Sequence, residues 1–170
     1  MKGDEAESRS FDSQRPRAVE TIMLGGLAIG VLDFLDASIF FTQYFGIELS
    51  RVWQGVAAGL LGQEAATAGG WNTAALGIVL HFVISFLVAA VYFAGTRFTG
   101  FLIRRPIVSG IAFGVIVHFV MQYVVIPLSA APGTAPFRWG PFLNGVIGHA
   151  FLVGLPVALI AKWSAGRKRN

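Results

Sequence analysis

Residues 73–95 read TAALGIVLHFVISFLVAAVYFAG, and this run contains no Asp, Glu, Lys or Arg. A helix of this length extends about 35 Å at about 1.5 Å per residue, which is enough to cross a hydrocarbon core about 30 Å thick. A lone strand is excluded because its backbone N–H and C=O groups would find no partners in lipid. This run therefore predicts a transmembrane helix.

Three further stretches have the same character, at 19–41, 107–128 and 142–163. The chain is 55% hydrophobic and only 13% charged, whereas a soluble domain carries about 25% charged residues. The predicted fold is an all-α integral membrane protein, a bundle of four transmembrane helices over residues 19–163. The first stretch has no small-residue cleavage site, so it predicts an uncleaved helix after a disordered tail at residues 1–18.

The distribution of Lys and Arg predicts the orientation of the bundle. Four lie before residue 18, three in the connection 96–106 and four after residue 161, whereas the connections 42–72 and 129–141 hold one each. Cytoplasmic segments carry the excess of basic residues, so both termini are predicted to be cytoplasmic, with a short basic tail at 164–170. These clusters account for the net charge of +4, and no nucleic-acid partner is expected.

The long connection at 42–72 is not expected to be a plain loop. Apolar residues recur at helical spacing within about 47–62, which predicts a helix lying in the outer membrane interface or a short re-entrant segment. Such a helix would be either a linker or a lid over the bundle interior. Tryptophan is common at membrane interfaces, and four are expected there: Trp53, Trp71 and Trp139 at the outer boundary and Trp163 at the inner one.

A few polar side chains interrupt the predicted spans. Ionisable residues are costly in hydrocarbon and normally face the bundle interior, which makes them candidates for function. Counting about 1.5 Å per residue brings one residue of each span to a similar depth in the outer half of the membrane, with two more closer to the outer boundary. This candidate intramembrane polar cluster comprises Asp33, His81, His118 and His149 at the common depth, and Asp36 and Gln122 nearer the boundary.

Each histidine follows a glycine placed four positions earlier. Residues four apart share a helix face, and small residues let membrane helices approach closely. The spacing therefore predicts that the histidines point toward neighbouring helices. The glycines expected at helix–helix contacts are Gly26, Gly30, Gly77, Gly110, Gly114 and Gly145.

Three interpretations of the polar cluster stay open. Its members can hydrogen-bond across helices simply to hold them together. Alternatively, the three histidines are candidate metal ligands, and His81 with His149 could bind one haem iron axially. The third interpretation is a proton relay or pH sensor built from Asp33 and the histidines. The first interpretation leads, and no cofactor is expected under it.

The chain contains no recognised catalytic motif. A Walker loop, a dinucleotide fingerprint, a nucleophile elbow and a zinc-protease motif are all absent from the sequence, and a chain without cysteine has no thiolate chemistry. The leading prediction is a non-enzymatic structural or accessory membrane protein. Its expected surroundings are the lipid bilayer and, because four helices enclose little space, a homo-oligomer or a membrane protein partner.

Four short segments carry a family resemblance. RRP at 104–106 leads into a glycine-rich span, with HFV at 118–120 and PL at 127–128, and GH at 148–149 follows a loop that bears Pro and Trp. Across residues 75–160 this arrangement resembles small bacterial inner-membrane proteins of the YagU type. The resemblance implies a four-helix, multi-pass protein of the bacterial cytoplasmic (inner) membrane, and it supplies no catalytic residues.

Overall fold

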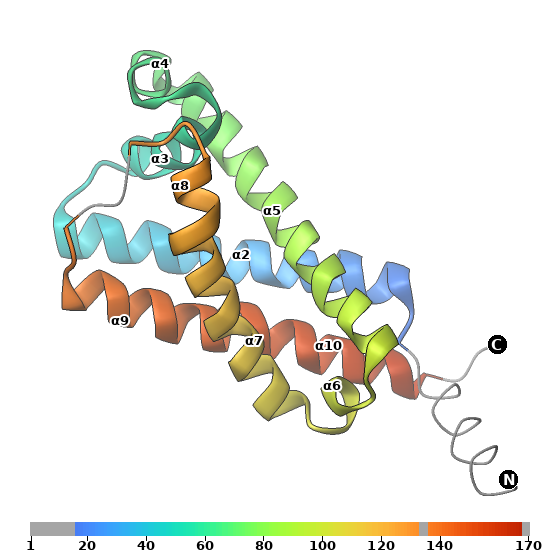
Figure 1. Ribbon diagram of the computed structural model, residues 1–170. Coiled ribbons are helices and arrows are strands. Elements are labelled where there is room, and N and C mark those ends of the chain that lie inside the picture. Colours follow the sequence, from blue (N-terminus) through green and yellow to red (C-terminus); the bar gives the residue numbers. More distant parts are fainter. Residues whose placement is uncertain (1–15, 133–135, 168–170) are drawn as a thin grey trace, which may run out of the picture.

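The computed structural model describes residues 16–132 and 136–167, and within these ranges the chain is helical with no strand (Figure 1). Four helical spans are long and apolar enough to cross a membrane. The predicted all-α fold with four long apolar helices is therefore confirmed. The spans are Ala18–Phe45 (α2), Gly70–Phe98 (α5), Pro106–Leu128 (α7, η1 and α8) and Trp139–Gly166 (α9, η2 and α10).

Each span contains its predicted segment. Three of them extend beyond it by up to four residues at an end, and Pro106–Leu128 extends by one residue. The predicted bounds follow the apolar runs, whereas the backbone hydrogen bonds of a helix continue through polar residues at its ends. The last helix ends at Gly166, inside the predicted tail 164–170. Residues 168–170 of that tail, and residues 1–15 of the predicted tail 1–18, lie outside the described residues.

Short helices occupy two of the connections. α3 (Leu49–Leu61) lies where a helix at 47–62 is predicted, and α4 (Gln63–Ala68) follows it. Gly62 separates the two with a φ of 77°, a left-handed conformation that glycine adopts without strain. α6 (Phe101–Arg104) joins α5 to α7.

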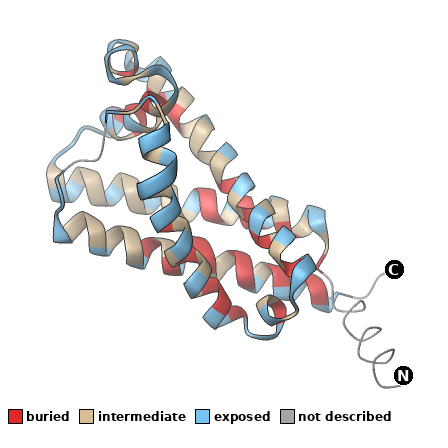
Figure 2. Cartoon of the chain, in the orientation of Figure 1, coloured by how far each residue is buried: buried red, intermediate tan, exposed pale blue. Residues whose placement is uncertain are grey.

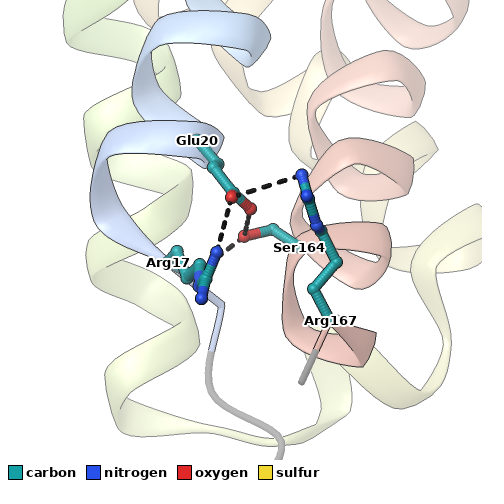
Figure 3. Close-up of polar contacts among 4 residues, drawn as sticks. All are labelled: Arg17, Glu20, Ser164 and Arg167. Atoms are coloured by element: carbon teal, nitrogen blue, oxygen red, sulfur yellow. Dashed lines mark hydrogen bonds and ion pairs between the residues drawn. The ribbon is translucent and has the colours of Figure 1, made fainter. Parts of the chain in front are cut away.

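The first and last long helices are tied together at one end of the molecule (Figure 3). Glu20, in the first turn of α2, accepts hydrogen bonds from Arg17 Nη1 at 2.9 Å and from Ser164 Oγ at 3.0 Å. Arg167 Nη1 lies 3.4 Å from Glu20 Oε1, and the backbone N–H of Arg17 donates to Ser164 Oγ at 2.9 Å. These contacts hold the beginning of α2 against the end of α10.

The four spans alternate in direction relative to this end (Figure 1). α6 and the end of α5 lie there as well, in contact with α10. We call this region the basic end, because it carries most basic residues of the described chain: Arg17, Arg97, Arg104, Arg105, Lys162 and Arg167. Arg51 at the start of α3 and Arg138 before α9 lie away from it.

The bundle is most completely packed in the half nearest the basic end (Figure 2). Small side chains from α5 and α10 let the helices approach there, and larger apolar side chains fill the space between them. The buried core of this half comprises Ile29, Ala89, Tyr92, Ile103, Val153, Val157, Ala158, Ala161 and Ala165. A second, smaller core joins α3 to α4 through Ala57, Ala58 and Ala66.

Two spans contain a π-helical segment just before a proline. η1 (Met121–Val125) precedes Pro127, and η2 (His149–Gly154) precedes Pro156. Proline has no backbone N–H, and its ring crowds the carbonyl four residues earlier. A wider helical turn relieves that crowding and often marks a functional site. Here each π segment includes one member of the predicted polar cluster.

Candidate functional site

A cavity of about 460 Å³ lies between the helices on the side of the core away from the basic end. Aliphatic and aromatic side chains form most of its wall, and Ser85, Ser129 and Asn144 add polar groups. All six members of the predicted polar cluster therefore face one common space. They are Asp33 and Asp36 from α2, His81 from α5, His118 from α7, Gln122 from η1 and His149 from η2.

His81 connects α5 to α2. Its Nε2 lies 3.0 Å from the carbonyl oxygen of Gly30, and because a carbonyl can only accept, the proton of this bond lies on Nε2. Its Nδ1 lies 3.9 Å from Asp33 Oδ2. A bare lone pair on Nδ1 would repel an ionised carboxylate, so the contact becomes attractive when one further proton lies on Nδ1 or on the carboxyl group. At 3.9 Å the two side chains make no hydrogen bond, and their contact is electrostatic.

Asp36 lies on the same helix, closer to the end of α2. Its Oδ2 accepts a hydrogen bond from Asn144 Nδ2 at 2.9 Å, which links α2 to α9. Gly148 leaves room for the carboxylate, because a Cβ there would lie 3.1 Å from Oδ2. Asp33 and His149 are close enough to interact with it electrostatically. No Lys or Arg within the described ranges pairs with Asp36.

His118 and His149 lie side by side, with ring centroids 5.1 Å apart and the rings tilted by 68°. His149 Nδ1 donates to the carbonyl oxygen of Gly145, one turn earlier in its own helix, at 2.9 Å. His118 is only 8% exposed, yet its ring has no hydrogen-bond partner in the part of the chain that the structure describes. Gln122, one turn further along the same span, also lines the cavity without such a partner. Both side chains therefore offer unused hydrogen-bonding groups to the cavity.

α3 forms one wall of the cavity, mainly through Trp53. This indole is 1% exposed and stacks on Phe34 of α2, with ring centroids 4.4 Å apart. Its centroid lies 5.1 Å from that of His81. The prediction that Trp53 is an interfacial anchor is therefore wrong, because the face of α3 that carries it packs against α2 and α5. Trp71, Trp139 and Trp163 are exposed on the described chain.

The six glycines predicted at helix contacts lie where neighbouring helices approach closely. A Cβ at Gly77 would overlap the backbone carbonyl of Trp53, and a Cβ at Gly114 would overlap that of His149. At Gly145 it would overlap the ring of His118. A Cβ at Gly26 would meet the ring of Phe86, and one at Gly30 would meet the ring of Phe82. A Cβ at Gly110 would meet the backbone of Gly154.

The metal and haem interpretations find little support in this geometry. Among residues 16–132 and 136–167, no group of three His, Asp, Glu or Cys side chains is placed to hold a metal ion. The predicted axial pair was His81 with His149, but the structure brings His149 against His118 and His81 against Asp33. Both ring nitrogens of His81 already face α2.

Comparison with known protein families, curated proteins and solved structures finds no match to this chain. The likeness of residues 75–160 to YagU-type proteins stays a sequence-based expectation. The functional interpretation therefore depends on the cavity itself.

Asn144 and Trp53 are among the cavity residues that the sequence-based prediction misses. Asn144 is a neutral amide and is therefore not among the ionisable residues of the spans, although it lies five positions before His149 in an otherwise apolar span. Its position, about one turn from the predicted depth of the cluster, is the feature from which Asn144 could have been predicted. The sequence predicts Trp53 at the lipid interface because tryptophan is common at membrane interfaces. Nothing in the sequence shows which face of α3 turns inward.

Proposed function

We propose that this protein is a non-enzymatic, multi-pass membrane protein that binds a small ligand in its intramembrane cavity. The observation that supports this most is the set of six polar side chains, contributed by all four spans, that line one space of about 460 Å³. Ligand pockets commonly have volumes of about 300–1,000 Å³ and combine apolar walls with a few convergent polar groups. Ligand binding is thus favoured over helix packing, which is the leading interpretation of the polar cluster from the sequence.

The hydrogen bonds of the cluster support the same choice. Side chains that only hold helices together should pair with one another across helices. Here Asp36 with Asn144 and His81 with Gly30 make such bonds. His149 bonds within its own helix, and His118 and Gln122 make no hydrogen bond to a described residue. Polar groups that are costly to bury and have no protein partner imply water or a ligand in the cavity.

The absence of cysteine from the sequence allows a direct test by single cysteine substitutions. Ser85→Cys and Ser129→Cys place thiols on the cavity wall, and Val79→Cys places one on an exposed, apolar face of α5. A small charged methanethiosulfonate reagent reacts with the thiolate, which forms only where water is present. We expect the protein in phospholipid vesicles to be labelled at Ser85→Cys and Ser129→Cys and to be unlabelled at Val79→Cys. An unreactive thiol at Ser85→Cys, which lies within α5, would show a dry, packed interior and refute the proposal.

A second candidate, proton relay through the membrane, is favoured by the contact between His81 and Asp33. His81 Nδ1 and Asp33 Oδ2 lie 3.9 Å apart, and neighbouring His and Asp side chains occur in proton-conducting membrane proteins. Vesicles containing the protein and a pH-sensitive dye should then show faster collapse of an imposed pH gradient than protein-free vesicles. Asp33→Asn should abolish the difference, and equal rates with and without the protein would exclude a relay.

We also propose a cytoplasmic location for the basic end, in a bacterial cytoplasmic membrane. The alternation of the spans and the concentration of Lys and Arg at one end support it. α3 would then lie at the outer interface, with Trp53 turned inward as part of a lid. Assembly into a homo-oligomer or with a membrane protein partner is compatible with the many exposed apolar side chains of the spans.

A further inference from the structure

Apart from three histidines, the ionisable side chains that line the cavity are carboxylic acids. Asp33 and Asp36 line it, and no Lys or Arg is among the described residues of the lining. His81 lies 3.9 Å from Asp33, and Asp36 has the neutral amide of Asn144 as its hydrogen-bond partner and His149 within electrostatic range. An ionised carboxylate is costly in an apolar environment unless a positive charge pairs with it. A cation beside Asp36 would stabilise its ionised form.

We propose that the cavity binds a protonated primary amine with an apolar body, and that the ammonium group lies against Asp36. This inference rests on the proposed function, because it names the class of ligand for the same cavity. A primary ammonium has three N–H donors and no acceptor. Oxygens of the Asp36 carboxylate, the side-chain oxygen of Gln122 and a ring nitrogen of His118 are acceptors of the kind it needs.

His118 supplies independent evidence that a polar ligand group belongs there. The residue is 8% exposed, and buried polar side chains are nearly always hydrogen-bonded. The imidazole lines the cavity but has no hydrogen-bond partner in the described part of the chain. A donor from a bound ammonium would satisfy a ring nitrogen of His118.

The remaining wall selects an organic cation over an inorganic one. Apolar side chains from α2, η1 and α8 make up much of it, among them Phe40, Phe41, Met121, Val125 and Ile126. Mg²⁺ and Ca²⁺ require about six oxygen ligands, and the described residues offer no group of three candidate side chains. The apolar walls instead suit the hydrocarbon part of an amine, whose burial contributes to its affinity.

Equilibrium dialysis of the full chain in phosphatidylcholine vesicles tests the proposal. The probes are hexylammonium, phenethylammonium and tryptammonium, with protein-free vesicles measuring the uptake by lipid alone. Zwitterionic lipid is chosen because anionic lipid would itself bind the cations. We expect saturable binding of at least one probe. The neutral analogue 2-phenylethanol and the quaternary phenethyltrimethylammonium, which lacks N–H donors, should bind at least about tenfold more weakly than phenethylammonium.

Asp36→Asn removes the charge while keeping the size of the side chain, and it should weaken amine binding by about tenfold or more. Glu64→Gln makes the same change on the exposed surface of α4 and should leave binding unchanged. Labelling of Ser85→Cys combined with Asp36→Asn shows whether the cavity of that variant is still formed. Equal loss of binding in both charge variants would overturn the assignment to Asp36.

The remaining outcomes separate this inference from the proposed function. If 2-phenylethanol binds as tightly as the amine, the cavity is an apolar site, and the assignment of a cation is overturned. If the quaternary cation binds equally well, the hydrogen-bond acceptors do not select the ligand, and the primary amine is overturned. If no amine binds while Ser85→Cys and Ser129→Cys are labelled, the inference fails and the hydrated cavity stands. Unreactive thiols together with no binding would refute both.

Discussion

At the scale of single residues, the histidines illustrate how much depends on contacts that a linear sequence does not show. All three were predicted to face the bundle interior from the glycines four positions earlier, and all three line the cavity. Their partners could not be predicted, because a partner depends on the rotation of one helix against another. His81 therefore meets the backbone of α2, whereas His149 bonds to its own helix.

The two hydrogen-bonded histidines should carry their protons on different ring nitrogens. Carbonyl oxygens only accept hydrogen bonds, so the structure predicts the Nε2–H form for His81 and the Nδ1–H form for His149. Imidazole ¹⁵N chemical shifts from solid-state NMR distinguish these forms. His81→Gln and His149→Gln assign the signals. A spectrum with the same tautomer at both positions would contradict one of the two hydrogen bonds.

The glycine contacts predict a residue-specific effect on stability. Gly114→Ala places a methyl group against the backbone of His149, and overpacking of this kind costs about 1–3 kcal/mol. Gly55→Ala in α3 meets nothing within 4 Å and should be neutral or stabilising, since alanine is the better helix former by about 0.5–1 kcal/mol. Thermal unfolding of the two variants in the same detergent measures the difference. Equal melting temperatures would contradict the close approach of α7 and η2.

At the scale of elements, the four spans and α3 were predicted from apolar runs and helical spacing. α4 and α6 were not, because helices of this length contain too few residues for a periodic pattern. The π segments were also not predicted, although Pro127 and Pro156 mark where they occur. A helix can accommodate a proline by a kink or by a widened turn. The packing of neighbouring helices selects between the two.

The attachment of α3 to α5 depends on the absence of a side chain at Gly77. A Cβ there would overlap the backbone of Trp53, so Gly77→Leu should push α3 away and open the small core it forms with α4. Ala57→Cys, at a site with no exposed surface, should be unreactive to maleimide alone and reactive when combined with Gly77→Leu.

Leu60→Cys provides the matched control for this test. Leu60 is exposed on α3, so its thiol should react to the same extent with glycine or leucine at position 77. Protection of Ala57→Cys in the Gly77→Leu background would show that α3 stays in place without the close contact. Hydrogen bonds from Gln54 to the carbonyl of Gly70 and from Thr73 to that of Ala66 would then be sufficient to hold it.

At the scale of the whole molecule, the count of Lys and Arg predicted an alternating bundle, and the structure places most described basic residues at one end. This agreement has a physical basis, since charge distribution along the sequence directly reflects topology. The sequence carries no comparable signal for the division of the bundle into a packed half nearest the basic end and a half that holds the cavity, which we call the hollow half. It arises where helices diverge, and the angles between them follow from many side-chain contacts together.

Membrane orientation can be tested with two exposed positions at opposite ends of α5. Asn72 lies near its start, and Thr99 directly follows it at the basic end. In intact cells that express single-cysteine variants, a membrane-impermeant maleimide should label Asn72→Cys and leave Thr99→Cys unlabelled until the cells are lysed. The reverse pattern would place the basic end outside, and labelling of both in intact cells would contradict a membrane-spanning α5.

The tie between Arg17, Glu20, Ser164 and Arg167 has a consequence for chain connectivity. Because the backbone N–H of Arg17 lies 2.9 Å from Ser164 Oγ, a linker of a few residues is long enough to join residue 167 to residue 17 and close this part of the chain into a ring. Cutting such a ring in the connection after α8 would create a circular permutant that preserves every helix. Its new termini would both emerge at the hollow half of the bundle, so it would have to insert in the membrane with its ends on the opposite side.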